Sequence, residues 1–299
     1  MAFKSPPQIS AAAVEVGTAK ADLTWDRALV GGFLAGAYIA FGSLVAIAVS
    51  SGLKPDTWGT LPTLFTGAVF ALGLILCIVA GGELLTGNMA LLPIALLRRR
   101  ITFAQLGVNW LLVLVGNLLG SLFVAWVLGW KTGVIGHSDA ATGAAGLEHA
   151  RAVAIAAGKG VAETDLQVFL RGIGCNWLVC LAVWLALAAE DVGGKILGIF
   201  FPIMAFVAMG FDHVVANMFF LPLGHFAGTP GLGWSNVVNN LVWAFLGNAV
   251  GAGVFVAGIY WFLHLRGTAQ VEPYPFGAPH EAPSASAPAT PVDQARGGR

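Results

Sequence analysis

An acid, an imidazole and an amide lie close together in a stretch that is otherwise apolar enough to cross a membrane. Asp212 and His213 are adjacent, Asn217 follows four residues later, and Asp212 is the only Asp, Glu, Lys or Arg between residues 196 and 265. A charge at membrane depth costs roughly 2.5 kcal/mol or more, so such residues usually serve a function. This stretch is therefore a candidate functional site.

The same pattern occurs in the first half of the chain. Gly81-Gly-Glu83 followed by Asn88-Met-Ala-Leu-Leu-Pro93 matches Gly210-Phe-Asp212 followed by Asn217-Met-Phe-Phe-Leu-Pro222, and both pairs have an offset of 129 residues. Equal offsets predict an internal repeat in which each half contains one acid and one amide at a polar interruption.

A second repeated pair supports this prediction. Gly116-Asn117-Leu-Leu-Gly120 and Gly247-Asn248-Ala-Val-Gly251 are 131 residues apart. A Gly-x-x-x-Gly spacing lets two helix backbones approach closely in a membrane. Asn117 and Asn248 are thus placed to anchor the interruptions from neighbouring spans.

Composition identifies the class of protein. Apolar residues make up 57% of the chain, charged residues 10%, and the mean hydropathy is +0.80. Soluble domains carry about 25% charged residues, so we predict an all-α integral membrane protein in a lipid bilayer. The formal net charge of zero gives no case for nucleic-acid binding. The sequence has no enzyme motif and no metal-ligand spacing, so we expect neither an enzyme nor a metal or cofactor.

Six apolar segments have spanning length, and the second and fifth are interrupted by the repeated motif. Three spans in each half force an inverted 3+3 topology, and paired interruptions of this kind mark transport sites. Ten Lys and Arg residues fall on one side and five on the other, which predicts that both termini are cytoplasmic. The segments are 28–51, 61–97, 102–130, 166–189, 195–223 and 236–264.

Three regions follow from this division. We expect residues 1–26 to form a mobile or interfacial cytoplasmic arm, residues 27–266 a transmembrane channel domain, and residues 267–299 a disordered cytoplasmic tail. The tail is rich in Pro, Ala and Ser, a composition that cannot bury a core.

The acids and amides of the repeat are expected to be structural. Glu83 and Asp212 are predicted to accept hydrogen bonds from backbone N–H groups that each helix break exposes. Asn88 and Asn217 provide donors that face the breaks. His213 differs, because Leu84 takes its place in the first half, and this asymmetry makes His213 the candidate for handling a proton.

Three stretches resemble signatures of the formate/nitrite transporter family. They are Ile78-Val-Ala-Gly-Gly-Glu-Leu-Leu-Thr-Gly87, Gly172-Ile-Gly-Cys-Asn-Trp-Leu-Val-Cys-Leu181 and Gly210-Phe-Asp-His-Val-Val-Ala-Asn-Met218. The resemblance covers about residues 25–265. It implies an aquaporin-like six-helix protomer in the inner membrane, a homopentamer with one pore in each protomer, and small monovalent anions as substrates.

The resemblance also assigns residues. The pore threonine falls on Thr86, the central histidine on His213, the pore asparagine on Asn248 and the entrance lysine, which attracts anions, on Lys159. Asn176, in the second signature, belongs with the structural residues of the helix breaks. Leu85 stands where the family commonly has phenylalanine, which widens the inner constriction. The constriction residues are Phe70, Leu74, Leu84, Leu85 and Phe206.

Formate and nitrite are the first substrates to consider, and hydrosulfide, acetate and lactate are the alternatives within the family. A naked anion pays a large desolvation penalty at the apolar constrictions, and neutralising it would remove most of that penalty. The anion would pass Phe70, Leu74 and Phe206 and take a proton near His213, with Thr86 hydrogen-bonding it. Either His213 or water would supply the proton. A neutral-solute channel of the aquaporin or ammonia type and a non-transporting membrane scaffold are the rival hypotheses.

Overall fold

The protein folds as a bundle of helices. The computed structural model describes residues 3–137 and 142–268, which all belong to one compact unit. Within these residues the only extended pairing is an isolated bridge between Phe3 and Ala189. Helices suit an apolar chain because each satisfies its own backbone polar groups. The predicted all-α class is confirmed.

The helices are named in chain order. The first half contains α1 (Pro6–Ala21), α2 (Trp25–Ser50), α3 (Pro55–Trp58), α4 (Leu61–Ile75), η1 (Leu76–Gly81), α5 (Leu85–Leu97), α6 (Phe103–Phe123) and η2 (Val124–Lys131). The second half contains α7 (Gly143–Ala157), η3 (Gly158–Ala162), α8 (Asp165–Ala188), α9 (Val192–Ala208), α10 (Val214–Phe226), α11 (Trp234–Ala252), η4 (Gly253–Gly258) and α12 (Ile259–His264).

Five continuous helices are long and apolar enough to cross a membrane, in the part of the chain that the structure describes. They are Trp25–Ser50, Leu61–Gly81, Phe103–Lys131, Asp165–Ala188 and Trp234–His264. The shorter apolar helices α5, α9 and α10 complete the two interrupted segments. The predicted interruptions are present, at residues 82–84 and 209–213.

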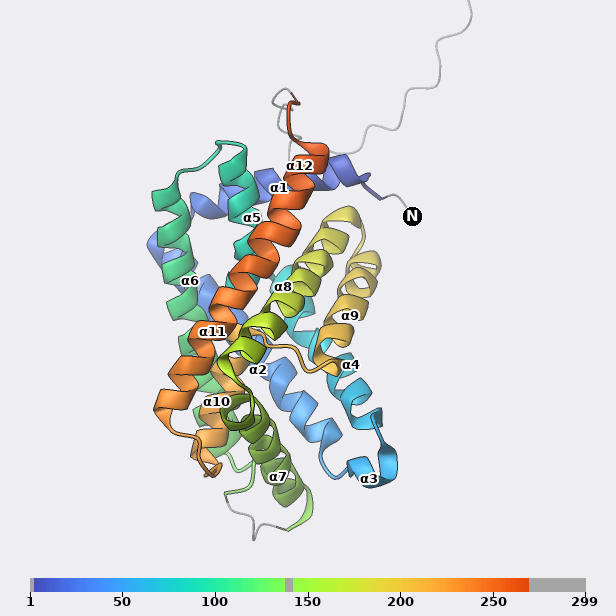
Figure 1. Ribbon diagram of the computed structural model, residues 1–299, viewed down its shortest axis with the longest axis vertical. Helices are drawn as coiled ribbons and strands as arrows, with labels where there is room; N and C mark the ends of the chain where they lie inside the picture. The colour runs from blue at the N-terminus through green and yellow to red at the C-terminus, as the bar shows by residue number, and fades with distance from the viewer. Residues whose placement is uncertain (1–2, 138–141, 269–299) are drawn as a thin grey trace, which may run out of the picture. The chain divides into compact units, whose positions relative to one another are not determined.

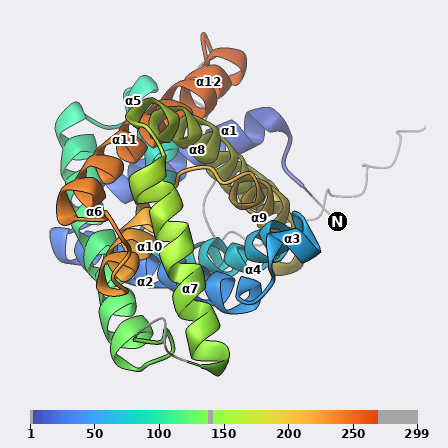
Figure 2. The same cartoon turned by 60° about the horizontal axis from the view of Figure 1, so that its bottom comes forward.

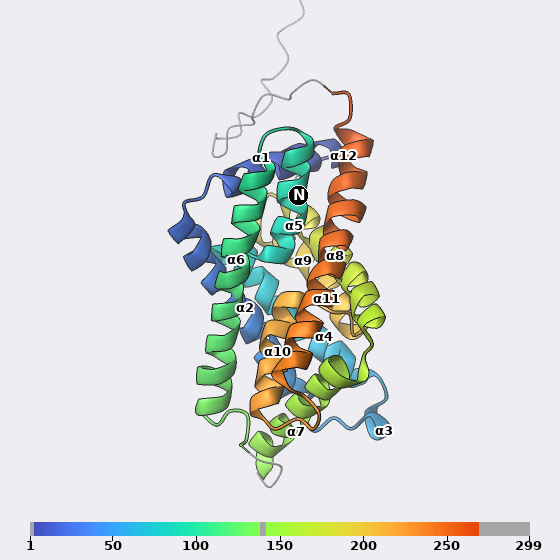
Figure 3. The same cartoon turned by 60° about the vertical axis from the view of Figure 1, so that its left-hand side comes forward.

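The half-length helices lie inside the bundle. In Figure 1 the long helices run along the long axis, while α1 lies across one end and α7 lies at the other. Figure 3 shows α5 near the α1 end and α10 near the α7 end, both between α6 and α11. Seen from below, α7 crosses the opposite end of the bundle (Figure 2). The two helix breaks therefore lie in the middle of the molecule.

Two connecting regions are more ordered than the sequence predicts. Residues 6–21 of the expected mobile or interfacial arm form α1, whose buried face includes Ala13 and Val14. The stretch between the third and fourth predicted spans, to which the sequence assigned no helix, contains α7 and η3. Nearly all of the predicted disordered tail lies outside the described residues.

Glycines bring two helix pairs into backbone contact. A Cβ on Gly120 of α6 would overlap the carbonyl oxygen of Phe33 in α2. In the second half, a Cβ on Gly251 of α11 would overlap the carbonyl oxygen of Ile173 in α8. The close approach that the Gly-x-x-x-Gly spacing predicts is thus confirmed in both halves.

Adding one methyl group at this contact should loosen the bundle. Gly120→Ala is expected to destabilise the detergent-solubilised protein by about 1–3 kcal/mol, the usual penalty of overpacking. Thermal unfolding measures this. Gly107→Ala in the same helix is the control, because a Cβ there meets open space. Equal unfolding temperatures for the two variants would contradict the packing argument.

Candidate functional site

Each helix break begins at a glycine with a left-handed backbone. Gly81 has φ +92° and Gly210 has φ +71°, values that residues with a Cβ rarely adopt. The chain then runs extended before the next helix starts at Leu85 or Val214. The glycines of the repeated motif therefore allow the chain to leave one helix and re-enter another.

In the first half, Asn117 holds the exposed backbone of the break. Its Nδ2 donates to the carbonyl oxygens of Gly32 and Glu83, both at 2.8 Å. Its Oδ1 accepts the N–H of Leu85 at 3.0 Å. The side-chain amide therefore satisfies two backbone groups of the break, the Glu83 carbonyl and the Leu85 N–H, and ties them to Gly32 inside α2.

In the second half, Asn248 makes the same three bonds. Its Nδ2 donates to the carbonyl oxygens of Gly172 and Asp212, both at 2.8 Å, and its Oδ1 accepts the N–H of Val214 at 2.9 Å. Asn248 is fully buried, and its two N–H donors are both used. The amide group that the resemblance assigns to the pore is thus occupied with the backbone.

The carboxylates of the repeat form ion pairs. Glu83 accepts from Lys20 Nζ at 2.7 Å, and Asp212 accepts from Lys159 Nζ at 2.8 Å. The prediction that these two carboxylates cap the helix breaks was wrong about their hydrogen-bond partners. The carboxylates instead accept hydrogen bonds from lysines and neighbouring amides, while the backbone N–H groups go to the two asparagines described above.

The neighbouring amides repeat as well. Asn88 Nδ2 donates to Glu83 at 3.0 Å, and Asn217 Nδ2 donates to Asp212 at 2.9 Å. Asn176, from α8, donates to the carbonyl oxygens of Thr86 at 3.1 Å and Asn248 at 2.9 Å. Each of these three amides therefore contacts a helix break.

Sequence reasoning missed the outer layer of this network. Asn109 accepts from Asn88 at 2.9 Å and donates to the carbonyl oxygen of Lys20 at 2.9 Å. Asn240 likewise accepts from Asn217 at 2.8 Å and donates to the carbonyl oxygen of Lys159 at 2.9 Å. Asn109 and Asn240 are 131 residues apart, which is the offset of the second repeated pair. This offset could have identified them from the sequence.

His213 connects the two half-helices. It is the N-cap of α10, where its Nδ1 accepts the N–H of Ala216 at 3.1 Å. With Nδ1 as an acceptor, the neutral ring carries its hydrogen on Nε2, which lies 2.8 Å from Thr86 Oγ1 in the first turn of α5. The N-terminal ends of α5 and α10 therefore meet through this pair. Thr86 keeps its own hydroxyl hydrogen for a further acceptor.

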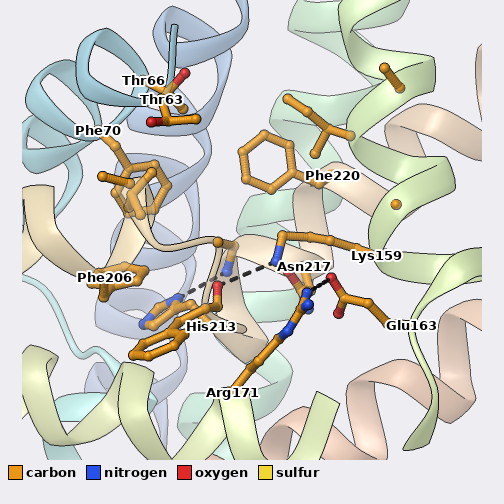
Figure 4. A pocket seen from close by; sticks show the side chains of 18 of the residues that line it. Thr63, Thr66, Phe70, Lys159, Glu163, Arg171, Phe206, His213, Asn217 and Phe220 are labelled. Carbon is orange, nitrogen blue, oxygen red and sulfur yellow. Dashed lines mark hydrogen bonds and ion pairs between the residues drawn. The ribbon is translucent and has the colours of Figure 1, made fainter. Parts of the chain in front are cut away.

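A cavity of about 240 Å³ at the α7 end leads to His213. Phe70 and Phe206 pack edge to face in its wall, with ring centroids 5.8 Å apart, and Phe206 stacks on the His213 ring (Figure 4). The predicted constriction residues Leu74, Leu84 and Leu85 are buried but are not part of this lining. The structure thus brings only the two phenylalanines of that set to the cavity.

Basic residues also reach this cavity. Lys159, Arg171 and Arg151 line it from η3, α8 and α7, and sequence reasoning had singled out only the lysine. Arg171 pairs with Glu163, as Figure 4 shows, and Arg151 Nε donates to Ser50 Oγ at 2.9 Å. Burial lowers the pKa of Arg151. Three cations therefore gather at this cavity, and carboxylates balance the charge of two of them.

An apolar helical bundle with two helices broken at a polar centre, and with a charged mouth leading to it, has the architecture of a membrane channel or transporter. A family profile described as formate/nitrite transporter matches residues 7–262, and the chain belongs to this family. The resemblance seen in the sequence is thereby confirmed.

Curated relatives cover nearly the whole domain. The chain is 46% identical over 264 residues to the uncharacterized transporter YrhG of Bacillus subtilis, covering 88% of this chain and 95% of the relative. It is 45% identical to a probable formate transporter of Methanothermobacter thermautotrophicus, covering 88% and 98%. It is 43% identical to the formate channel BtFdhC of Bacillus thuringiensis, covering 87% and 96%.

Two solved structures share the fold at 30% sequence identity. An FNT family ion channel superposes with a TM-score of 0.73 and covers 86% of this chain and 98% of its own. A pentameric formate channel with formate bound gives a TM-score of 0.69 and covers 81% and 98%.

Replacing the brace of the second break should unfold that region. Asn248→Ala leaves the carbonyl oxygens of Gly172 and Asp212 and the N–H of Val214 without this partner. Each buried unsatisfied group costs about 1–3 kcal/mol. We expect a large drop in thermal stability. The control is Asn239→Ala on the same helix, since that exposed side chain bonds only to Asp165. A drop no larger than in the control would refute the bracing role.

Proposed function

We propose that this protein moves small monovalent anions, formate or nitrite first among them, across the inner membrane. The contact between Thr86 Oγ1 and His213 Nε2 is the observation that carries the proposal. It places a hydroxyl donor, itself hydrogen-bonded by the imidazole N–H, where two helix N-termini meet, and helix N-termini favour negative charge. The names of the relatives agree with such a substrate. Transport of this kind needs no enzymatic step and no cofactor.

The proposed topology has six spans in an inverted 3+3 arrangement of the aquaporin type, with both termini cytoplasmic. The hydrogen bonds of Asn117 and Asn248 support two equivalent halves, because each amide makes the same three contacts at its own break. Residues 27–266 would form the channel, between the arm of residues 1–26 and the tail of residues 267–299. The likeness to a pentameric formate channel supports a homopentamer.

Anions would enter at the α7 end. Lys159 and Arg151 raise the local anion concentration there, although the charge of the lysine is balanced by Asp212 at 2.8 Å. Phe70 and Phe206 form the outer constriction. Leu74, Leu84 and Leu85 would form the rest of the apolar path beyond the central pair.

Neutralising the anion removes most of its desolvation penalty at these constrictions. His213 is limited in how it takes part, since its Nδ1 caps α10. Giving up the Nε2 hydrogen would leave an imidazolate, and adding one at Nδ1 would break the cap. We therefore assign proton supply to water, with Thr86 and His213 polarising the anion–water pair. Asn248 supports the break instead of touching the anion.

Removing the hydroxyl of Thr86 should impair transport. Thr86→Val keeps the side-chain shape but removes the hydroxyl that would donate to the anion, and a hydrogen bond to a charged group is worth about 1.5–3 kcal/mol. Uptake of labelled formate by proteoliposomes should fall roughly tenfold or more. Thr86→Ser, which keeps the hydroxyl, should retain most of the flux.

Two further variants complete this test. Thr66→Val also alters a threonine that lines the cavity, but its hydroxyl bonds within its own helix, to Pro62, so flux should not change. His213→Leu introduces the residue of the first half and should lower flux as Thr86→Val does. Unchanged uptake in both the Thr86→Val and His213→Leu proteins would refute the proposal.

Competition between anions should define the substrate range. Unlabelled formate and nitrite should inhibit uptake of labelled formate at lower concentrations than acetate or lactate do. Apolar constrictions discriminate between substrates of different size, by a few kcal/mol at most. The measurement is inhibition at two pH values. Osmotic swelling of vesicles in glycerol without formate uptake would instead indicate a neutral-solute channel.

A further inference from the structure

Two carboxyl groups, those of Glu163 in the cavity wall and of Asp212 beside it, interact with each other, and the function described above does not use this contact. Glu163 lies at the C-cap of η3, and Asp212 lies in the break between α9 and α10. Glu163 lines the cavity next to His213 and also a second cavity of about 360 Å³, which Asn240 and Asp165 help to line. The carboxyl of Glu163 therefore separates two spaces at the α7 end.

The two acids are each bound on one oxygen only. Asp212 Oδ1 accepts from Lys159 at 2.8 Å and from Asn217 at 2.9 Å, and Glu163 Oε1 accepts from Arg171. Asp212 Oδ2 and Glu163 Oε2 are buried, and no donor among the described residues reaches either atom. The two side chains interact directly with each other.

Two buried acceptor oxygens from adjacent carboxylates repel each other, and a single proton between them removes the repulsion. The proton also supplies the missing donor, since a protonated carboxyl has an O–H that its neighbour accepts. We propose that Glu163 and Asp212 hold one proton between them, forming a proton-binding site beside the path to His213. The step is a reversible binding of one proton from water.

The charged groups around this site determine how the bound proton changes the net charge of the cavity. Lys159 faces it from η3, Arg171 from α8 and Arg151 from α7, while His213 lines the same cavity from the break. With the proton bound, the two ion pairs together carry one net positive charge, and without it they carry none. If the protein transports anions as proposed above, the cavity would attract anions most strongly when this proton is bound.

The protonation behaviour of Glu163 supports the geometry. Burial, followed by the charge of Asp212, raises the pKa of Glu163 to about 7. An acid with a raised pKa binds its proton below that value and loses it above, so occupancy changes near neutral pH. The protonated fraction of such a group falls roughly tenfold between pH 6 and pH 8.

Infrared spectroscopy of the full-length protein detects the proton directly. We expect a buried carboxylic-acid C=O band that titrates near pH 7 in the wild type and is absent in Glu163→Gln. Asp212→Asn should remove the same band and provides a second variant. Asp165→Asn is the control, because that exposed acid lies near the second cavity and should leave the band unchanged. A band that persists in both Glu163→Gln and Asp212→Asn would overturn the proposal.

Formate uptake then tests the consequence of the charge. Glu163→Gln mimics the protonated acid, so its uptake should equal that of the wild type at pH 6 and exceed it about tenfold at pH 8. A constant ratio of the two at both pH values would contradict the role of the proton in anion entry. If neither protein takes up formate, the proposed function fails, and the infrared band still decides whether the proton site exists.

Discussion

Two buried asparagine amides hold the interrupted backbone on which the whole centre of the protein depends. A helix that stops inside an apolar bundle leaves carbonyl and N–H groups without partners, and nothing but protein is there to satisfy them. Asn117 and Asn248 each pair two such groups, one carbonyl oxygen and one N–H, and also bind a carbonyl oxygen of an adjacent continuous helix. The starts of α5 and α10 are thereby tied to the continuous helices beside them.

The two halves differ at one position that is important for the proposed anion transport. Leu84 and His213 are both N-caps, but only the histidine side chain caps its helix. One ring nitrogen of the imidazole therefore caps α10, and the other contacts Thr86 at the start of α5. Fixing one ring nitrogen also fixes the tautomer, which orients the donor without any help from a second charged residue.

The sequence predicted the features that depend on local chemistry. Apolar segment lengths gave the helices, the repeated glycines located the breaks, and the spacing of Gly120 and its neighbours predicted close packing. The partners of Glu83 and Asp212 were not predictable, because Lys20 and Lys159 approach from connecting segments whose lengths differ between the halves. The contact of Glu163 with Asp212 was not predictable for the same reason, because residues 158–162 lie between the predicted spans.

The backbone contacts at Gly120 and Gly251 have a consequence for how such a passage changes over evolution. Helices that touch through their main chains lie at a fixed distance from each other, because no side chains between them can become shorter or longer. The width of the passage is then adjustable only through the side chains that project into it. An exchange at Phe70 or Phe206, which line the cavity, would therefore change its width while the architecture stays the same.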